Sequence, residues 1–196
     1  MGAERKTRAD ARRNRLKIME TARAQIAQHG PAVSMSQLAR AAGVAVGTLY
    51  RHFPTKTDLV AAVVNEHIER LVEAAEQAWA RVQCGRGDPG QEVLRLVRLM
   101  MEASVSDHAV KAAAHALGAE LSYDEAEARA AGPLTGLIAA GREAGVLRPD
   151  LEVSDIYLLA ATVPSDQPAA VRERWLALIQ SGLLRAPVPS PLPAPS

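Results

Sequence analysis

Residues 33–56, VSMSQLARAAGVAVGTLYRHFPTK, decide the fold class because they have the outline of a helix-turn-helix. Ser34 precedes an apolar-periodic run and has Gln37 three residues later, the spacing of a capping box at a helix start. Helical spacing then relates three apolar residues on one face: Leu38, Ala39 and Ala42. Gly43 is expected to end this helix, because glycine takes the left-handed conformation at little cost. A tight turn and a second helix over residues 46–53 should follow.

The second helix is predicted to bury one face and to present the other. Leu49 and Phe53 stand four residues apart, so they should pack inward with Val44 and Leu38. The opposite face has small residues, hydroxyl groups and one arginine, which suits the floor of a DNA major groove. The side chains predicted to meet the base edges are Val46, Gly47, Thr48 and Arg51.

A second set of residues is predicted to contact the DNA backbone. Hydroxyl, imidazole and ammonium groups near helix starts can bind phosphate oxygens and fix the orientation of the protein on the duplex. In this chain these predicted phosphate contacts are Ser34, Ser36, Tyr50, His52 and Lys56.

The stretch GVAVGTLYRHFPTKTDL, residues 43–59, resembles the signature of the tetracycline-repressor (TetR) family, Gly-Val-x-x-Gly-Thr-Leu-Tyr-x-His-Phe-x-x-Lys-x-x-Leu. All ten specified positions match in order. The resemblance implies a transcriptional regulator that binds a palindromic operator as a homodimer and is released by a small-molecule effector. Ala45 departs from the pattern, because the family often has Ser or Thr there as the cap of the recognition helix.

Charge is distributed unevenly along the 196 residues. Residues 1–56 carry 11 Lys and Arg against 3 acids, whereas residues 57–196 carry 12 against 19. A basic segment that contains a helix-turn-helix is typical of a nucleic-acid-binding face. Composition agrees with an all-α protein, since 48% of residues are hydrophobic and only 3% are aromatic.

The chain divides into four predicted segments. Residues 1–10 form a flexible basic arm, and residues 11–57 a helix-turn-helix domain completed by a helix from about residue 9 to 29. Residues 58–185 form a helical effector-binding and dimerisation domain, entered by an unbroken helix over about residues 56–82. Helices are expected next at about 92–105, 109–117, 124–144, 153–162 and 168–183, about nine in all. Residues 186–196 are a proline-rich, disordered tail.

The last predicted helix has two apolar stripes, one more than a peripheral helix of a monomer needs. The first contains Val171, Trp175 and Leu178, and the second contains Leu176, Ile179 and Leu183. The second of these two faces is interpreted as a dimer seam, in which the last two helices meet a second copy of the chain. The alternative is that both stripes are intramolecular core.

An effector pocket is predicted between the long helix and the helices that follow. Its candidate lining is Trp79, Met100, Met101 and His115. Thioether and aromatic groups line adaptable apolar pockets, and a histidine can orient a polar ligand. Each of these residues can equally be ordinary core or surface.

The sequence has no phosphate loop, no GxSxG and no His-Glu-x-x-His motif, so we do not expect an enzyme or a cofactor. The sequence has no signal peptide, no apolar run of about 18 residues and a single cysteine, Cys84. We therefore expect a cytoplasmic protein away from membranes. Three alternatives remain open. They are an architectural DNA-binding protein without an effector, a ligand-binding protein whose DNA-binding domain has lost its function, and a metal-responsive regulator using Cys84, Asp107, His108 and His115.

Overall fold

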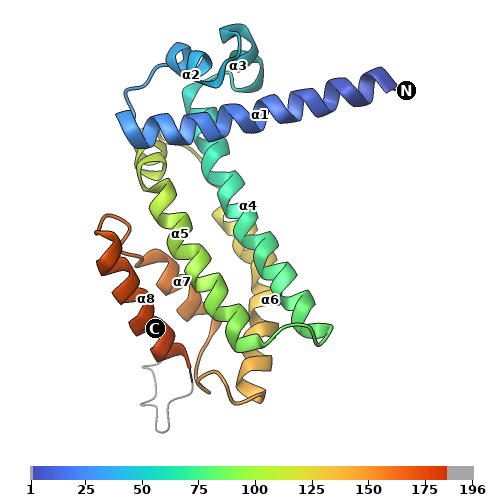
Figure 1. Ribbon diagram of the computed structural model, residues 1–196, viewed down its shortest axis with the longest axis vertical. Coiled ribbons are helices and arrows are strands. Elements are labelled where there is room, and N and C mark those ends of the chain that lie inside the picture. Colours follow the sequence, from blue (N-terminus) through green and yellow to red (C-terminus); the bar gives the residue numbers. More distant parts are fainter. Residues whose placement is uncertain (1, 185–196) are drawn as a thin grey trace. The chain divides into compact units, whose positions relative to one another are not determined.

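A computed structural model describes residues 2–184, with side chains from residue 10 onward. The described residues form eight helices and no strand, apart from an isolated bridge between Leu147 and Leu184 (Figure 1). The all-α class predicted from the sequence is confirmed, and the number of helices is close to the nine expected. The predicted disordered tail lies outside the described residues.

The chain divides into two compact units. The first contains residues up to His67 together with residues 106–122, and the second contains residues 68–105 and those from Tyr123 on. The long helices α4 (Lys56–Gln83) and α5 (Pro89–Ala116) each contribute to both units. The domain boundaries predicted from the sequence stay predictions.

The first unit is built on α1 (Gly2–His29), α2 (Met35–Ala42) and α3 (Val46–His52), and α1 lies beside α2 in Figure 1. Its interior is aliphatic with one aromatic ring. Fully buried side chains include Ile18, Ile26, Leu38, Leu49, Phe53 and Leu59. Helix α1 begins at Gly2, so residues 2–10 are helical where a flexible arm was predicted. Ala, Glu, Lys and Arg in this segment are all good helix formers.

Helix α5 is continuous where two helices, 92–105 and 109–117, were expected. Asp107 lies in the interval between the two predicted helices, but its side chain is buried and paired with Arg23 of α1. Since the polar group has a partner in the interior, the helix does not need to end there.

The second unit contains the remaining parts of α4 and α5 with α6 (Tyr123–Glu143), α7 (Val153–Ala161) and α8 (Ala169–Leu183). Leu137, Leu147, Leu151, Ile156 and Leu176 are each at most 1% exposed in its core. The segment after α6 is held to the end of α8 by a hydrogen bond of 3.0 Å from Arg148 N to Leu183 O. No helix in the described part of the chain combines the length and the apolar character that a membrane crossing requires.

Candidate nucleic-acid interface

Helix α2 is capped at both ends as its sequence predicts. Gln37 N donates to Ser34 Oγ at 3.2 Å, and Ser34 N donates to Gln37 Oε1 at 2.8 Å. This reciprocal pair satisfies two amide groups that a helix start leaves without partners. Gly43 ends the helix with φ at +63°, in the left-handed region. The two caps fix where the turn begins and hence where α3 can start.

Helix α3 begins at Val46 after Ala45, which has extended backbone and no side-chain cap bond. The Ala45 carbonyl accepts from Thr48 N at 2.8 Å and from Leu49 N at 3.1 Å. Leu49 and Phe53 are both buried and pack the inner face of the helix into the core of the first unit. Packing of the inner face therefore holds α3 in place without the hydroxyl cap.

The outward face of α3 carries the residues that the sequence assigns to DNA. Val46 is 40% exposed and Tyr50 is 46% exposed, so both side chains are accessible to a partner. Gly47 and Arg51 are also exposed, whereas Thr48 and His52 are half-buried. One helix thus presents a small, mixed apolar and polar surface of the kind that fits a major groove.

The predicted phosphate contacts flank this face on neighbouring elements. Ser34 and Ser36 are exposed at the start of α2, and the Ser34 hydroxyl also lies 2.9 Å from Gln37 Oε1. At the start of α4, Thr55 and Asp58 cap each other: Asp58 N donates to Thr55 Oγ1 at 3.0 Å and Thr55 N to Asp58 Oδ2 at 2.9 Å. Lys56 follows that cap, and its ammonium donates to the carbonyl of Pro31 in the loop before α2.

Arg15 of α1 is a contact of α3 that the sequence reasoning missed. Its guanidinium carbon lies 4.4 Å from the centroid of the Phe53 ring, a cation–π contact at the C-terminal end of α3. The two residues are 38 positions apart and share no local pattern, so nothing in the sequence could have signalled the contact.

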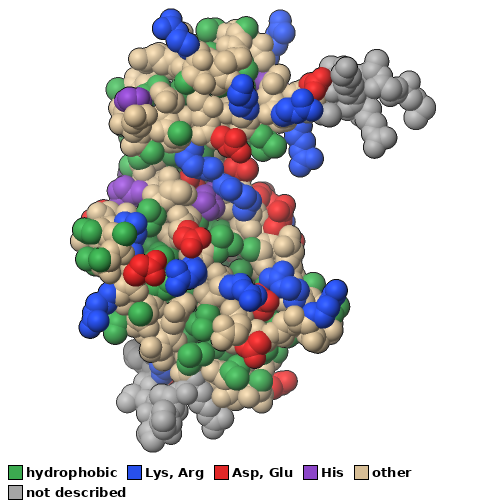
Figure 2. Space-filling model, in the orientation of Figure 1, with side chains coloured by type: hydrophobic (Ala, Val, Ile, Leu, Met, Phe, Trp, Pro, Cys, Tyr) green, Lys and Arg blue, Asp and Glu red, His purple; other side chains and the backbone are tan. Residues whose placement is uncertain are grey.

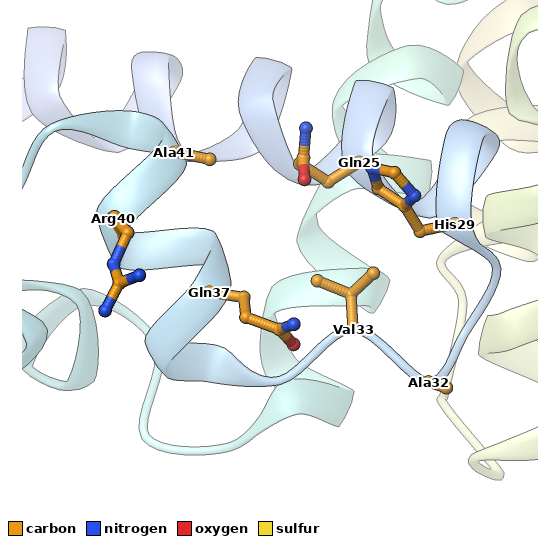
Figure 3. A pocket seen from close by; sticks show the side chains of 7 residues that line it. All are labelled: Gln25, His29, Ala32, Val33, Gln37, Arg40 and Ala41. Atoms are coloured by element: carbon orange, nitrogen blue, oxygen red, sulfur yellow. The ribbon is translucent and has the colours of Figure 1, made fainter.

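A hollow of about 460 Å³ lies between the C-terminal end of α1 and α2. Figure 3 shows its lining, in which Gln25 and His29 come from α1 and Gln37 and Arg40 come from α2. None of the candidate effector residues lines it. Figure 2 shows Lys and Arg side chains over the α1–α3 part of the molecule, in agreement with the basic N-terminal sequence.

The candidate effector residues fall in both units. Trp79 and Met100 are half-buried against the core of the second unit, and Met101 is buried within it. His115 belongs to the first unit and is exposed near the end of α5. Their joint role as an effector pocket stays a prediction.

The residues proposed for a metal have other surroundings. Asp107 is paired with Arg23 and lies against His67, and Cys84 is exposed in the second unit. Among residues 10–184, no three His, Cys, Asp or Glu side chains come together in a group that could hold a metal ion.

Comparison with known proteins agrees with this geometry. Residues 18–63 match the model of bacterial regulatory proteins of the tetR family, and residues 88–185 match the C-terminal domain of SbtR-like transcriptional regulators. A TetR transcription regulatory protein from Mycobacterium vanbaalenii is similar in structure, with a TM-score of 0.72 and 35% identity over 91% of this chain and 99% of the other. The chain belongs to the TetR family.

Two further proteins extend the comparison. A TetR transcriptional regulator from Streptomyces coelicolor has a TM-score of 0.69 and 25% identity, covering 87% of this chain and 98% of the other. An HTH-type transcriptional regulator from Staphylococcus aureus is 38% identical over 80 residues, which are 39% of this chain and 41% of that regulator's length. As a TetR-family member, the chain is a DNA-binding transcriptional regulator.

Proposed function

We propose that this TetR-family regulator is a repressor that binds a palindromic operator as a homodimer. The observation that carries the proposal is the outward face of α3, where Val46, Gly47, Tyr50 and Arg51 are exposed together. A lone helix of this size reaches few bases, so two copies on successive major grooves are needed for strong discrimination.

Exposed apolar residues on the last two helices support the dimer. Leu158 of α7 is 61% exposed, and Val171 and Leu178 of α8 are 47% and 63% exposed. The second stripe of α8, which was predicted to form the seam, is instead turned inward, because Leu176 and Leu183 are buried in the core of the second unit. Within one chain, the stripe that contains Val171 and Leu178 therefore remains largely uncovered, and a second copy of the same face would cover it.

We propose further that a small apolar effector releases the operator. Its site would lie in the second unit around Trp79, Met100 and Met101, where aromatic and thioether groups can adapt to a ligand. Effector and DNA would oppose each other through a coupling free energy, typically about 1–3 kcal/mol.

Selection of binding sites from random duplex DNA by the purified protein tests the proposal, with the mass of the protein in solution measured alongside. The expected result is an enriched palindrome bound by a dimer. Weak, salt-sensitive binding without an enriched sequence would contradict it and would favour an architectural DNA-binding protein. A screen of apolar small molecules for release of the selected site then tests the effector.

A further inference from the structure

Four charged or titratable side chains from three helices meet around Asp107 inside the first unit. Arg23 of α1 donates from Nε to Asp107 Oδ1 at 2.7 Å and from Nη2 to Glu66 Oε2 at 3.3 Å. On α4, His67 Nδ1 lies 2.5 Å from Asp107 Oδ2. The Asp107 side chain is only 1% exposed, so this cluster is shielded from solvent.

The cluster keeps a buried carboxylate charged. Burial raises the pKa of Asp107, but the contacts with His67 and Arg23 outweigh it and hold the pKa below its ordinary value. A proton on His67 Nδ1 must face Asp107 Oδ2, because two acceptors would repel each other at this distance. Neither of these two atoms has another hydrogen-bond partner among the described side chains. Each therefore depends on the other, and losing one leaves a buried polar atom unpaired.

The cluster lies where α4 and α5 pass from the first unit into the second. His67 is the last residue of the first unit on α4, and Ser106 is its first residue on α5. The His67–Asp107 contact therefore joins these two helices at the point where both continue into the second unit. Arg23 ties this junction to α1, which contacts α2, and α2 in turn contacts α3.

We propose that Asp107 is a positioning residue for DNA binding. By holding Arg23 and His67, it fixes α1 on α4 and α5 in the setting in which α2 and α3 bind the operator. Asp107 is buried and acts through α1 rather than through a contact with DNA. This inference rests on the proposed function.

Glu92 provides a matched control on the same helix. It is also a buried carboxylate, and Arg81 donates to it from Nε at 3.0 Å and from Nη2 at 2.8 Å. Arg95 adds a third bond at 2.8 Å. Glu92 belongs to the second unit, however, and its partners Arg81 and Arg95 lie on α4 and α5. Removing the charge of Glu92 therefore tests the loss of a buried ion pair while the His67–Asp107 contact stays intact.

The experiment compares full-length Asp107→Asn and Glu92→Gln with the unchanged protein. Affinities for the selected operator and for random duplex DNA are measured at one salt concentration. We expect Asp107→Asn to weaken operator binding by about 3- to 30-fold and to leave random binding unchanged, with Glu92→Gln near the unchanged protein on both. An operator affinity that is unchanged or raised in folded Asp107→Asn would overturn the inference. So would equal losses on operator and random DNA, or the same effect from Glu92→Gln.

Hydrogen exchange provides a readout that does not need an operator. In Asp107→Asn, protection should fall more in α2 and α3 than in α6, and Glu92→Gln should not show this pattern. If the unchanged protein selects no operator, the proposed function fails, and this comparison still decides whether Asp107 holds α2 and α3 in their setting. If Asp107→Asn does not fold, His67→Ala removes one partner while Arg23 still pairs with Asp107, and it is judged by the same two readouts.

Discussion

The indole of Trp79 on α4 lies directly against the backbone of Gly136 on α6. A methyl group at residue 136 would stand 2.6 Å from both Cε2 and Cζ2 of the indole, closer than carbon atoms approach without displacement. The contact explains why a glycine occupies the middle of α6 despite its low helix propensity. Trp79 therefore has a definite packing role in the second unit, which any effector reaching it would have to disturb.

Gly136→Ala is expected to destabilise the protein by about 1–3 kcal/mol, because the indole or α6 must shift to admit the methyl group. Urea unfolding followed by circular dichroism measures the change. Gly182→Ala in α8 is the control, since nothing lies within 4 Å of the added Cβ and no proline follows it. There the better helix propensity of alanine should stabilise by about 0.5–1 kcal/mol. Equal effects at the two positions would contradict the packing argument.

Ala45→Ser is expected to stabilise the protein by about 1 kcal/mol, because it supplies the N-cap bond that α3 lacks. Chemical unfolding of the two proteins in parallel measures the gain. Ala41→Ser is the control, because this exposed alanine lies within α2 and cannot act as a cap. A gain at residue 41 as large as that at residue 45 would show that capping is not the cause.

Arg51→Ala should weaken binding to the selected operator by about 1–3 kcal/mol, the range for a lost bidentate contact with a guanine. Random duplex DNA should be affected far less, because Arg51 is predicted to read a base and not a phosphate. Titration of labelled duplexes at fixed salt gives both values. Equal losses on the two duplexes would remove Arg51 from the base-reading set.

Lys56→Ala should weaken all duplexes similarly and lower the slope of log affinity against log salt by about one unit. The reason is that its ammonium is predicted to meet a phosphate once it leaves the carbonyl of Pro31. Affinities at several salt concentrations give the slope. If the slope stays constant and the unfolding free energy falls, Lys56 serves only to fasten the loop before α2.

Glu92→Gln should make stability less sensitive to acid. Hydrogen bonds from Arg81 lower the pKa of Glu92 and outweigh the opposing effect of burial. The folded protein therefore binds fewer protons than the unfolded chain, so this contribution is present above the unfolded pKa of about 4.3 and lost as pH falls through the lower folded value. The free energy of unfolding should be measured from about pH 7 to about pH 3, a range that spans the unfolded pKa of about 4.3. It should fall less in the variant than in the unchanged protein.

The control for this change is Glu102→Gln, which removes one exposed carboxylate from the same helix. At neutral pH, Glu92→Gln should be the less stable of the two variants, because Arg81 and Arg95 lose a charged partner. If the free energy of unfolding falls equally with pH in Glu92→Gln and in the unchanged protein, the ion pair does not contribute to acid sensitivity.

The sequence predicts the helix-turn-helix well because its signals are local. The capping box of Ser34 and Gln37 and the left-handed Gly43 act within four residues of the helix they bound. The buried face of α3 follows from the spacing of Leu49 and Phe53 alone. The predicted DNA-contacting face then consists of the residues that remain on the other side of the helix.

Features that depend on distant partners are harder to predict. In the sequence, Asp107 is only a candidate metal ligand, because Arg23 and His67, which pair with it, lie 84 and 40 residues away. The packing of Trp79 against Gly136 is hidden from the sequence for the same reason, since only the fold brings the two residues together. Burial of a polar or aromatic group is decided by tertiary packing, which a single sequence does not display.

Both α4 and α5 run without a break from one compact unit into the other, and this limits how such a chain can change in length. One extra residue inserted between positions 67 and 68 would turn every side chain beyond it by about 100° around the helix axis. Deletions there would have the same effect in the opposite sense. A chimera that exchanges the DNA-reading part for another must therefore be joined inside two helices at once, with the turn of each preserved.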